Sequence, residues 1–309
     1  MQIIGSDIKE KVLKAMDAYD YDVYTAADVE RALSNESCSI EDFKALLSPA
    51  AAPYLEQMAR KAEEITKNHF GNTVYIFTPL YIANYCQNYC IYCGFNCYNN
   101  IRRKKLSFEE IDLTMIDETS VFHFGTLSLT DDPVRTATKK CVEYAKEHGK
   151  LITFDPNLRL PLWETTDAAK EQILWGLAHA DVVKISDEEV EFLWGITDEK
   201  EAAEKLLDEF GIRLAMITMG PKGAYLANQN GAAYAKCPKV KPIDTTGAGD
   251  IFGGSAVSRL LKTGKAPEEL STEELGFIGQ FACTAASIST TQSGGIPSIP
   301  EESVVLDRM

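Results

Sequence analysis

The stretch Asp244-Thr245-Thr246-Gly247-Ala248-Gly249-Asp250 is followed at once by the small-residue run Ile251-Phe252-Gly253-Gly254-Ser255-Ala256. Its paired glycines let the backbone turn tightly, and the residues after them predict a helix that starts here. The first N–H groups of a helix have no intrahelical partner and carry partial positive charge. This helix start is therefore suited to an anion such as a phosphoryl group in transfer.

Asp250 falls in the first turn of the expected helix, where the helix dipole favours an ionised carboxylate. A carboxylate beside an anion site can take a proton from a hydroxyl while a phosphoryl group moves to the oxygen. The stretch thus predicts a phosphotransfer site. The alternative is a glycine-rich helix entry that binds nothing, which short motifs always allow.

Around this stretch, short apolar segments alternate with amphipathic helical segments, which predicts a mostly parallel, doubly wound α/β sheet. The expected strands are Val121–Gly125, Leu151–Asp155, Asp181–Ile185 and Leu214–Thr218. The expected helices include Pro133–His148, Asp167–His179, Glu199–Phe210 and Glu273–Ser289. Gly223–Ala227 and Ala232–Ala235, on either side of Asn230-Gly231, predict a hairpin at the sheet edge.

In open parallel sheets, ligands bind at the carboxyl ends of the strands, so the residues after each strand are candidates. Asp155-Pro156-Asn157-Leu158-Arg159 offers Asn157 to a sugar or phosphate and Arg159 to a phosphate. A proline turn with a surface salt bridge would look the same. After the next strand, Glu189 could arrange Mg²⁺, or it could belong to an ordinary N-capped helix turn.

The heptad Asp244–Asp250 resembles the signature of the ribokinase-like (PfkB) sugar kinases, and the chain from about Leu113 resembles the second half of a bacterial fructokinase. The resemblance implies that Asp250 is the catalytic base and that Gly247, Ala248 and Gly249 form the anion hole. Asp244 and Thr246 match positions that often help to hold a monovalent cation such as K⁺.

The same resemblance implies that Asn157 and Arg159 face the substrate cleft. It implies that Lys184 and Glu189 serve the nucleotide and Mg²⁺, although Ser186 stands where these kinases usually have asparagine. Thr218-Met219-Gly220-Pro221-Lys222-Gly223 matches a T-x-G-x-x-G segment, so Thr218, Gly220 and Gly223 would meet the phosphates of ATP.

The first 106 residues have a different character. Residues from about Ile8 to Phe70 are expected to be helical, with caps at Thr25 and Ser39, and Val74–Phe77 is expected to be a strand. Cys86, Cys90 and Cys93 have the C-x3-C-x2-C spacing that can hold a [4Fe–4S] cluster with one open iron. A zinc knuckle that includes Cys97, or thiols without a metal, are the alternatives.

This front segment resembles the start of 2-iminoacetate synthase, a radical S-adenosylmethionine enzyme of thiazole biosynthesis. The resemblance implies that Cys86, Cys90 and Cys93 ligate the cluster and that S-adenosylmethionine binds to it. It ends near Leu106, so we expect residues 1–106 to be a truncated radical-enzyme segment. Residues 107–309 are expected to be a ribokinase-like nucleotide-binding half-domain with an incomplete sheet.

The composition of the 309 residues is ordinary for a globular protein, and the net charge of -15 argues against nucleic acid or an anionic membrane as a partner. Eight cysteines without an export signal favour a reducing cytoplasm. Cys141, Cys237 and Cys283 are scattered and expected to be buried, and the four histidines have no motif partner. The strand edges of an incomplete sheet could pair two copies into a homo-oligomer.

These observations favour a carbohydrate kinase that transfers the ATP γ-phosphoryl group to a sugar hydroxyl. The residues leave two alternatives open. One is a fragment of a radical enzyme, and the other is a nucleotide-binding protein without turnover, because both resemblances are partial.

Overall fold

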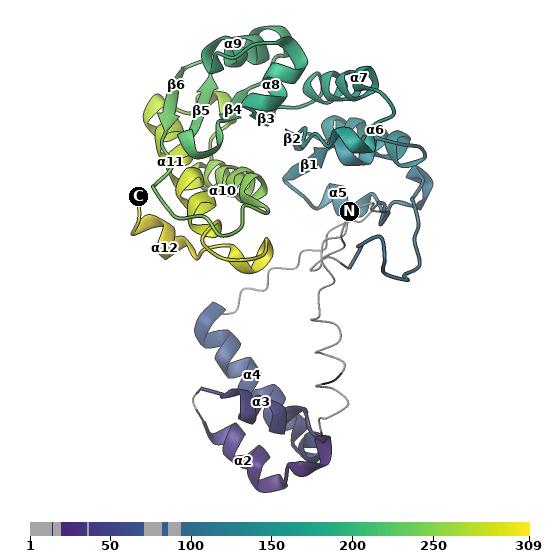
Figure 1. The fold of residues 1–309 in the computed structure, drawn as a ribbon, viewed down its shortest axis with the longest axis vertical. Helices are drawn as coiled ribbons and strands as arrows, with labels where there is room; N and C mark the ends of the chain where they lie inside the picture. Colours follow the sequence, from purple (N-terminus) through teal and green to yellow (C-terminus); the bar gives the residue numbers. More distant parts are fainter. Residues whose placement is uncertain (1–13, 15–19, 36, 71–81, 86–93) are drawn as a thin grey trace. The chain divides into compact units, whose positions relative to one another are not determined.

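The computed structural model describes residues 14, 20–35, 37–70, 82–85 and 94–309 (Figure 1). The chain divides into two compact units, Met1–Leu80 and Tyr81–Met309. The change of character expected after residue 106 falls inside the second unit and stays a prediction.

The described part of the first unit is helical, as expected from the periodicity. Its elements are η1 (Tyr21–Val23), α2 (Ala26–Ser34), α3 (Ile40–Leu47), η2 (Pro49–Tyr54) and α4 (Leu55–Phe70). Thr25 and Ser39 begin α2 and α3 in capping boxes with Asp28 and Asp42, because each side chain pairs with the backbone N–H groups of a helix start. The expected strand Val74–Phe77 lies outside the described residues.

The second unit is built on a six-stranded sheet in the order β1-β2-β3-β4-β5-β6. The first four strands run parallel, and β5 and β6 form an antiparallel hairpin at the edge. The strands are β1 (Val121–Gly125), β2 (Leu151–Asp155), β3 (Val182–Ser186), β4 (Leu214–Thr218), β5 (Ala224–Asn228) and β6 (Gly231–Ala235). The expected strands and hairpin are therefore confirmed to within one residue.

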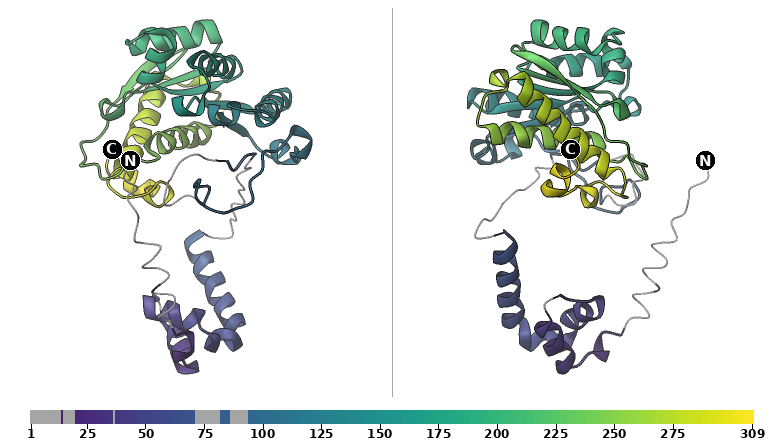
Figure 2. Two further views of the ribbon diagram at one scale, coloured as in Figure 1. Left: turned by 45° about the vertical axis from the view of Figure 1, so that its right-hand side comes forward. Right: turned by 90° about the vertical axis from the view of Figure 1, so that its left-hand side faces the viewer.

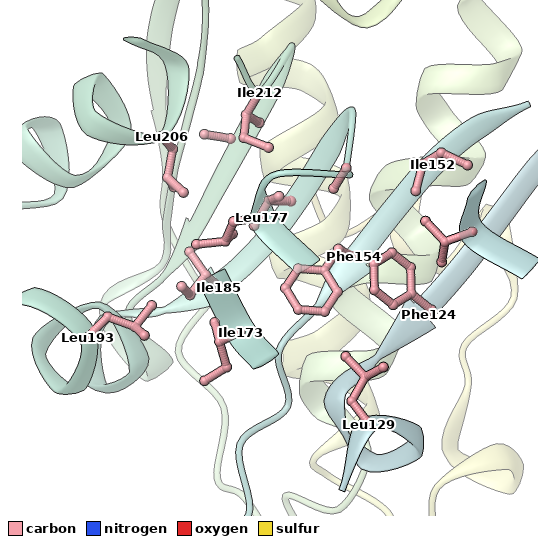
Figure 3. Close-up of a cluster of buried hydrophobic side chains, with 14 of the residues drawn as sticks. Phe124, Leu129, Ile152, Phe154, Ile173, Leu177, Ile185, Leu193, Leu206 and Ile212 are labelled. Carbon is pink, nitrogen blue, oxygen red and sulfur yellow. The ribbon is translucent and has the colours of Figure 1, made fainter. Parts of the chain in front are cut away.

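One face of the sheet carries a continuous apolar core. It is covered by α6 (Val134–Glu147), α7 (Thr166–Leu177), α8 (Asp187–Trp194) and α9 (Glu199–Phe210). Phe124 and Phe154 from neighbouring strands lie with ring centroids 4.7 Å apart at the centre of this core (Figure 3). A Cβ atom on Gly176 would come within 2.4 Å of the Phe154 ring, so α7 can lie this close only with glycine there.

The opposite face is covered by α10 (Ala248–Thr263) and α11 (Thr272–Ser289), which follow the last strand (Figures 1 and 2). Both faces therefore carry helices. The strand order, however, lacks the reversal that the expected doubly wound sheet would have. The strands follow one another in space without a reversal, and right-handed crossovers then place every connecting helix on one face.

Shorter elements complete the second unit. They are η3 (Phe108–Glu110), α5 (Thr114–Asp117), η4 (Thr126–Leu129), η5 (Leu160–Leu162), η6 (Gly220–Lys222), η7 (Pro267–Glu269), η8 (Ile296–Ser298) and α12 (Glu302–Leu306). Among the residues that the structure describes, no helix combines the length and apolar character needed to cross a bilayer.

Candidate active site

The Asp244–Asp250 stretch forms a turn that opens α10. Gly247 is the residue that caps the helix, and its φ of +77° lies in the left-handed region that glycine adopts without strain. The amide of Ile251 donates to the Gly247 carbonyl oxygen at 2.8 Å and begins the regular helix pairing, while the Ala248 amide donates back to the Thr245 carbonyl oxygen at 3.2 Å. Asp250 is exposed in the first turn, beside the amides that precede this pairing. The expected helix start is confirmed.

Lys184 of β3 lies directly against this helix start. A Cβ atom on Gly249 would be 3.2 Å from Lys184 Nζ, so the ammonium group approaches the backbone where a larger residue would crowd it. Nζ donates to both carboxylate oxygens of Asp155, at 3.1 and 3.3 Å. Both side chains of the pair are almost fully buried. A buried cation thus stands next to the first turn of α10.

The charges of Asp155, Lys184, Glu189 and Asp250 influence one another, and we call these residues the strand-end cluster. Burial, together with the neighbouring carboxylates of Glu189 and Asp250, raises the pKa of Asp155 to about 6, although Lys184 opposes the shift. The carboxylates of α8 and α10 therefore lie close enough to act on the Asp155–Lys184 pair. Because carboxylates outnumber the ammonium group in this cluster, a bound anion is favoured only on the side where Lys184 and the start of α10 lie.

His123 of β1 and Thr153 of β2 extend the cluster along the sheet. The two residues are partners in the parallel register, and His123 Nδ1 lies 2.9 Å from Thr153 Oγ1. Partial desolvation lowers the pKa of His123, and Asp250 opposes this effect. Sequence reasoning left His123 without a role. Polar residues inside strands that are otherwise apolar are the signal that could have indicated it.

The loop after β2 is held by the carboxylate of Glu189. Glu189 Oε1 accepts the amide of Leu158 at 2.8 Å, and Oε2 accepts the amide and hydroxyl of Ser186, both at 2.9 Å. Ser186 and Glu189 form the capping box of α8, which is the ordinary helix start considered from sequence. Glu189 therefore positions the loop that carries Asn157.

The two loop residues expected to face the substrate differ in their environment. Asn157 has a φ of +47°, a left-handed conformation that asparagine tolerates better than most residues, and its amide donates to Asp155 Oδ1 at 3.1 Å. Arg159 is exposed, and its guanidinium donates to the neighbouring carbonyl oxygen of Leu158 at 3.0 Å. Asn157 is thus tied to the cluster through Asp155. Arg159 forms no ion pair with a residue that the structure describes.

The Thr218–Gly223 loop follows β4, as expected. The amide of Met219 donates to the Gly223 carbonyl oxygen at 2.8 Å and closes the loop. Gly223 has a φ of +116°, and a Cβ atom there would lie 2.0 Å from the carbonyl oxygen of Ala235, so only glycine fits. Gly220, at φ +54°, is exposed with open space around its Cα, which leaves its backbone accessible. Thr218 is partly buried next to Ser186, its register partner.

Asp244 ties the turn before α10 to the loop after α11. Its carboxylate accepts the amides of Thr246 and Gly294, each at 2.9 Å, and these bonds lower the pKa of Asp244. A pocket of about 550 Å³ opens here. Its lining includes Thr246, Gly247, Asp250, Gly254, Gly295 and Ile296. Asp250 therefore borders a cavity, as a residue that acts on a bound molecule must.

The oxygen-bearing side chains of this site suit a cation that is bound partly by phosphate groups and water. In the described residues, no group of three His, Cys, Asp or Glu side chains forms a metal cage. This fits Mg²⁺, which is commonly held by phosphates and water with one or two carboxylates. The expectation that Asp244 and Thr246 help to hold K⁺ stays a prediction. Cys86, Cys90 and Cys93 lie outside the described residues.

Residues 94–302 match the model of the pfkB family carbohydrate kinases. The chain belongs to the pfkB family of carbohydrate kinases. The match includes every residue of the strand-end cluster and the Asp244–Asp250 stretch.

Individual pfkB-family members resemble the chain over the same part. Fructokinase-1 of Zea mays is 39% identical over 204 residues, which cover 65% of this chain and 62% of that protein. A fructokinase structure from Vibrio cholerae O395 with fructose, ADP and calcium ion has a TM-score of 0.55 and 30% identity, covering 64% of each chain. A putative ribokinase II from E. coli, in complex with ATP and Mg²⁺, has a TM-score of 0.56 and 25% identity, covering 66% of this chain and 64% of that one.

The chain spans about three fifths of the length of the curated pfkB relatives it matches. A double mutant of the Vibrio cholerae fructokinase is described with fructose, ADP and potassium ion, at a TM-score of 0.57 and 30% identity over 64% of this chain and 63% of that one. None of these matches supports the resemblance of the first 106 residues to 2-iminoacetate synthase.

Proposed function

We propose that this pfkB-family chain transfers the γ-phosphoryl group of ATP to a sugar hydroxyl, with fructose as the first acceptor to test. The observation that carries the proposal is the start of α10, where exposed Asp250 borders a pocket and Lys184 Nζ lies against Gly249. Sequence similarity to fructokinases supports fructose among the sugars.

In the proposed reaction, Asp250 accepts the proton of the sugar hydroxyl as the hydroxyl oxygen attacks the γ-phosphorus atom of ATP. The bond between that phosphorus and the β–γ bridging oxygen breaks, and ADP leaves. The amides of Gly247 and Gly249 donate to the phosphoryl oxygens as negative charge develops, and Lys184 adds positive charge behind them. The Ala248 amide, which donates to the Thr245 carbonyl oxygen at 3.2 Å, would join them only by exchanging that bond. Mg²⁺ bound to the phosphates would neutralise further charge when present. Thr218, Gly220 and Gly223 would hold the phosphates from the β4 side, and Asn157, positioned by Asp155, would bind the sugar or phosphate.

Replacing the proposed base tests this function most directly. In Asp250→Asn, we expect the rate of fructose phosphorylation to fall by about 10²- to 10⁴-fold, because general base catalysis is lost. The affinity for ADP, measured by calorimetry, should stay within a few-fold. The matched control is Asp167→Asn, which alters an aspartate in the first turn of α7 on the other face of the sheet. An Asp250→Asn enzyme as fast as the wild type would remove Asp250 from this role.

A nucleotide-binding protein without turnover is the second candidate, and the partial coverage of the relatives favours it. The loop after β4 and the start of α10 could bind a nucleotide even if the sugar were not held. Binding of ATP with no phosphate transfer to fructose or other hexoses would support this candidate. Turnover that Asp250→Asn abolishes would exclude it.

A further inference from the structure

Helix α11 lies very close to the β5–β6 hairpin. A Cβ atom on Gly279 would come within 2.9 Å of the Ala235 Cβ atom and 2.7 Å of Leu226 Cδ1, so no side chain separates helix and hairpin there. Cys283 is one helical turn after Gly279, and Cys237 follows Ala235, the last residue of β6, by two residues. The Sγ atom of Cys283 lies 3.9 Å from the Ala235 carbonyl oxygen. The contact at Gly279 thus brings the two cysteines toward each other.

Gln280 fixes the backbone next to Cys237. Its amide nitrogen donates to the Lys236 carbonyl oxygen at 3.0 Å, and its Oε1 accepts the Lys236 amide at 3.3 Å. The chain just before Cys237 is therefore attached to α11. Cys283 belongs to the apolar cluster between the sheet and α10–α11, and Cys237, 46 residues earlier, packs against the same cluster. The expected burial is confirmed for Cys141 and Cys283, whereas Cys237 is only partly buried.

The two thiols have different environments. Cys237 is half-buried, whereas Cys283 is fully buried. Hydrogen bonds from Cys283 and Ser287 lower the pKa of Cys237 to about 6. The neighbouring Cys237 sulfur and burial raise the pKa of Cys283. A thiolate that solvent reaches, next to a second thiol that keeps its proton, is the arrangement in which an oxidised cysteine is resolved by its neighbour.

The pair also contacts the Thr218–Gly223 loop. The Sγ atom of Cys237 lies 3.6 Å from the Gly220 carbonyl oxygen. Two residues earlier, the Ala235 carbonyl oxygen occupies the space that a side chain on Gly223 would need. A change at Cys237 therefore acts on the loop without passing through the catalytic aspartate.

We propose that Cys237 and Cys283 form an oxidisable pair that a peroxide converts to a disulfide. The Cys237 thiolate attacks one peroxide oxygen, the O–O bond breaks, and the products are Cys237 sulfenic acid and hydroxide. The thiol of Cys283 then displaces the sulfenic oxygen as water, and the S–S bond forms. Overall, two thiols and hydrogen peroxide give one disulfide and two waters, so the thiols are oxidised and the peroxide is reduced.

The disulfide should weaken nucleotide binding, and this consequence rests on the proposed function of the Thr218–Gly223 loop. The new bond draws the Cys237 sulfur toward α11 and away from the Gly220 carbonyl oxygen. We expect the affinity for ADP to fall by about tenfold, a typical coupling between linked sites. Thiol reductants should restore it.

The experiment treats the full chain with hydrogen peroxide, blocks the remaining thiols, and maps its peptides without reduction. A peptide that links Cys237 to Cys283, absent after reduction, is the expected result. Cys237→Ser and Cys283→Ser should each lack it. Cys141→Ser should keep it, because Cys141 is buried on the opposite face and burial raises its pKa to about 11.

Failure to find that linkage, or a bond from Cys237 to Cys38 or Cys97 instead, would overturn the proposal. Calorimetry with ADP distinguishes the formation of the disulfide from its effect on nucleotide binding. If the linkage forms but the affinity for ADP is the same before and after oxidation, the proposed effect on the Thr218–Gly223 loop is wrong. If the reduced protein binds no ADP, the proposed function fails, while the peptide map still decides the pair.

Discussion

The two faces of the sheet are built differently. On the face under α6–α9, residues such as Phe124, Phe154 and Ile185 make an unbroken apolar layer. On the other face, α10 and α11 cover apolar residues of β3–β6, but toward β1 the same face carries His123, Thr153, Asp155 and Lys184. One sheet thus has a face that only stabilises the fold and a face divided between packing and charge.

The difference shows how a site can be built without disrupting a core. Side chains alternate between the faces of a strand, so β2 can direct Phe154 into the apolar layer and Asp155 into the strand-end cluster. The apolar face bears the stability, and this allows the other face to hold buried charge, which is costly unless it is paired. Three predictions test this division, beginning with the largest effect.

Removing the aromatic side chain at the centre of the apolar face should be the most damaging change. For Phe154→Ala, we expect the free energy of unfolding to fall by about 3–5 kcal/mol, because the lost burial leaves a cavity beneath Gly176. Urea denaturation would measure it. Phe277→Ala, at an exposed position on α11, is the matched control and should change stability far less. Similar losses in both variants would mean that this face is not the principal core.

On the divided face, the stability lost by breaking the Lys184–Asp155 pair should be recovered when both residues are replaced. Lys184→Met leaves the buried Asp155 carboxyl without its partner, and we expect a loss of about 2 kcal/mol in unfolding free energy. Replacing both residues, as Lys184→Met with Asp155→Leu, should recover most of this stability, since no unpaired charge remains. ADP affinity should stay weakened in the double variant. If the double variant were less stable than the single one, the pair itself would be a main source of stability.

A smaller effect should appear as a dependence on pH. The pKa of Asp155 is raised from an ordinary 3.8 to about 6, so between these values the folded protein binds more protons than the unfolded chain. The unfolding free energy from this group therefore decreases as pH rises, by about 1 kcal/mol between pH 5 and 7.

Urea denaturation at pH 5, 6 and 7 should show this decrease as a difference between wild type and Asp155→Asn. His123, whose pKa is lowered, acts in the opposite direction in both proteins and largely cancels in that difference. A difference that does not change with pH would place Asp155 in a less buried environment than the structure shows.

Much of the second unit could be predicted from local pattern. The strand β1 coincides with the expected residues, and the capping boxes of Ser107 with Glu110 and Ser186 with Glu189 depend on residues three apart. The face on which each crossover helix lies was not predicted, because it depends on the order of strands in space. Nor was the role of His123, whose neighbours come from β2 and α10.

The sequence alone placed the strands of the second unit to within one residue, and it showed that Gly247 opens a helix with an aspartate in its first turn. These features depend on residues within one turn or one strand. Only the tertiary structure decided that Lys184 pairs with Asp155, that Glu189 holds the loop of Asn157, and that Cys237 packs against the cluster that contains Cys283. Those contacts join residues 29 to 46 positions apart, and their geometry exists only once the sheet and its covering helices have assembled.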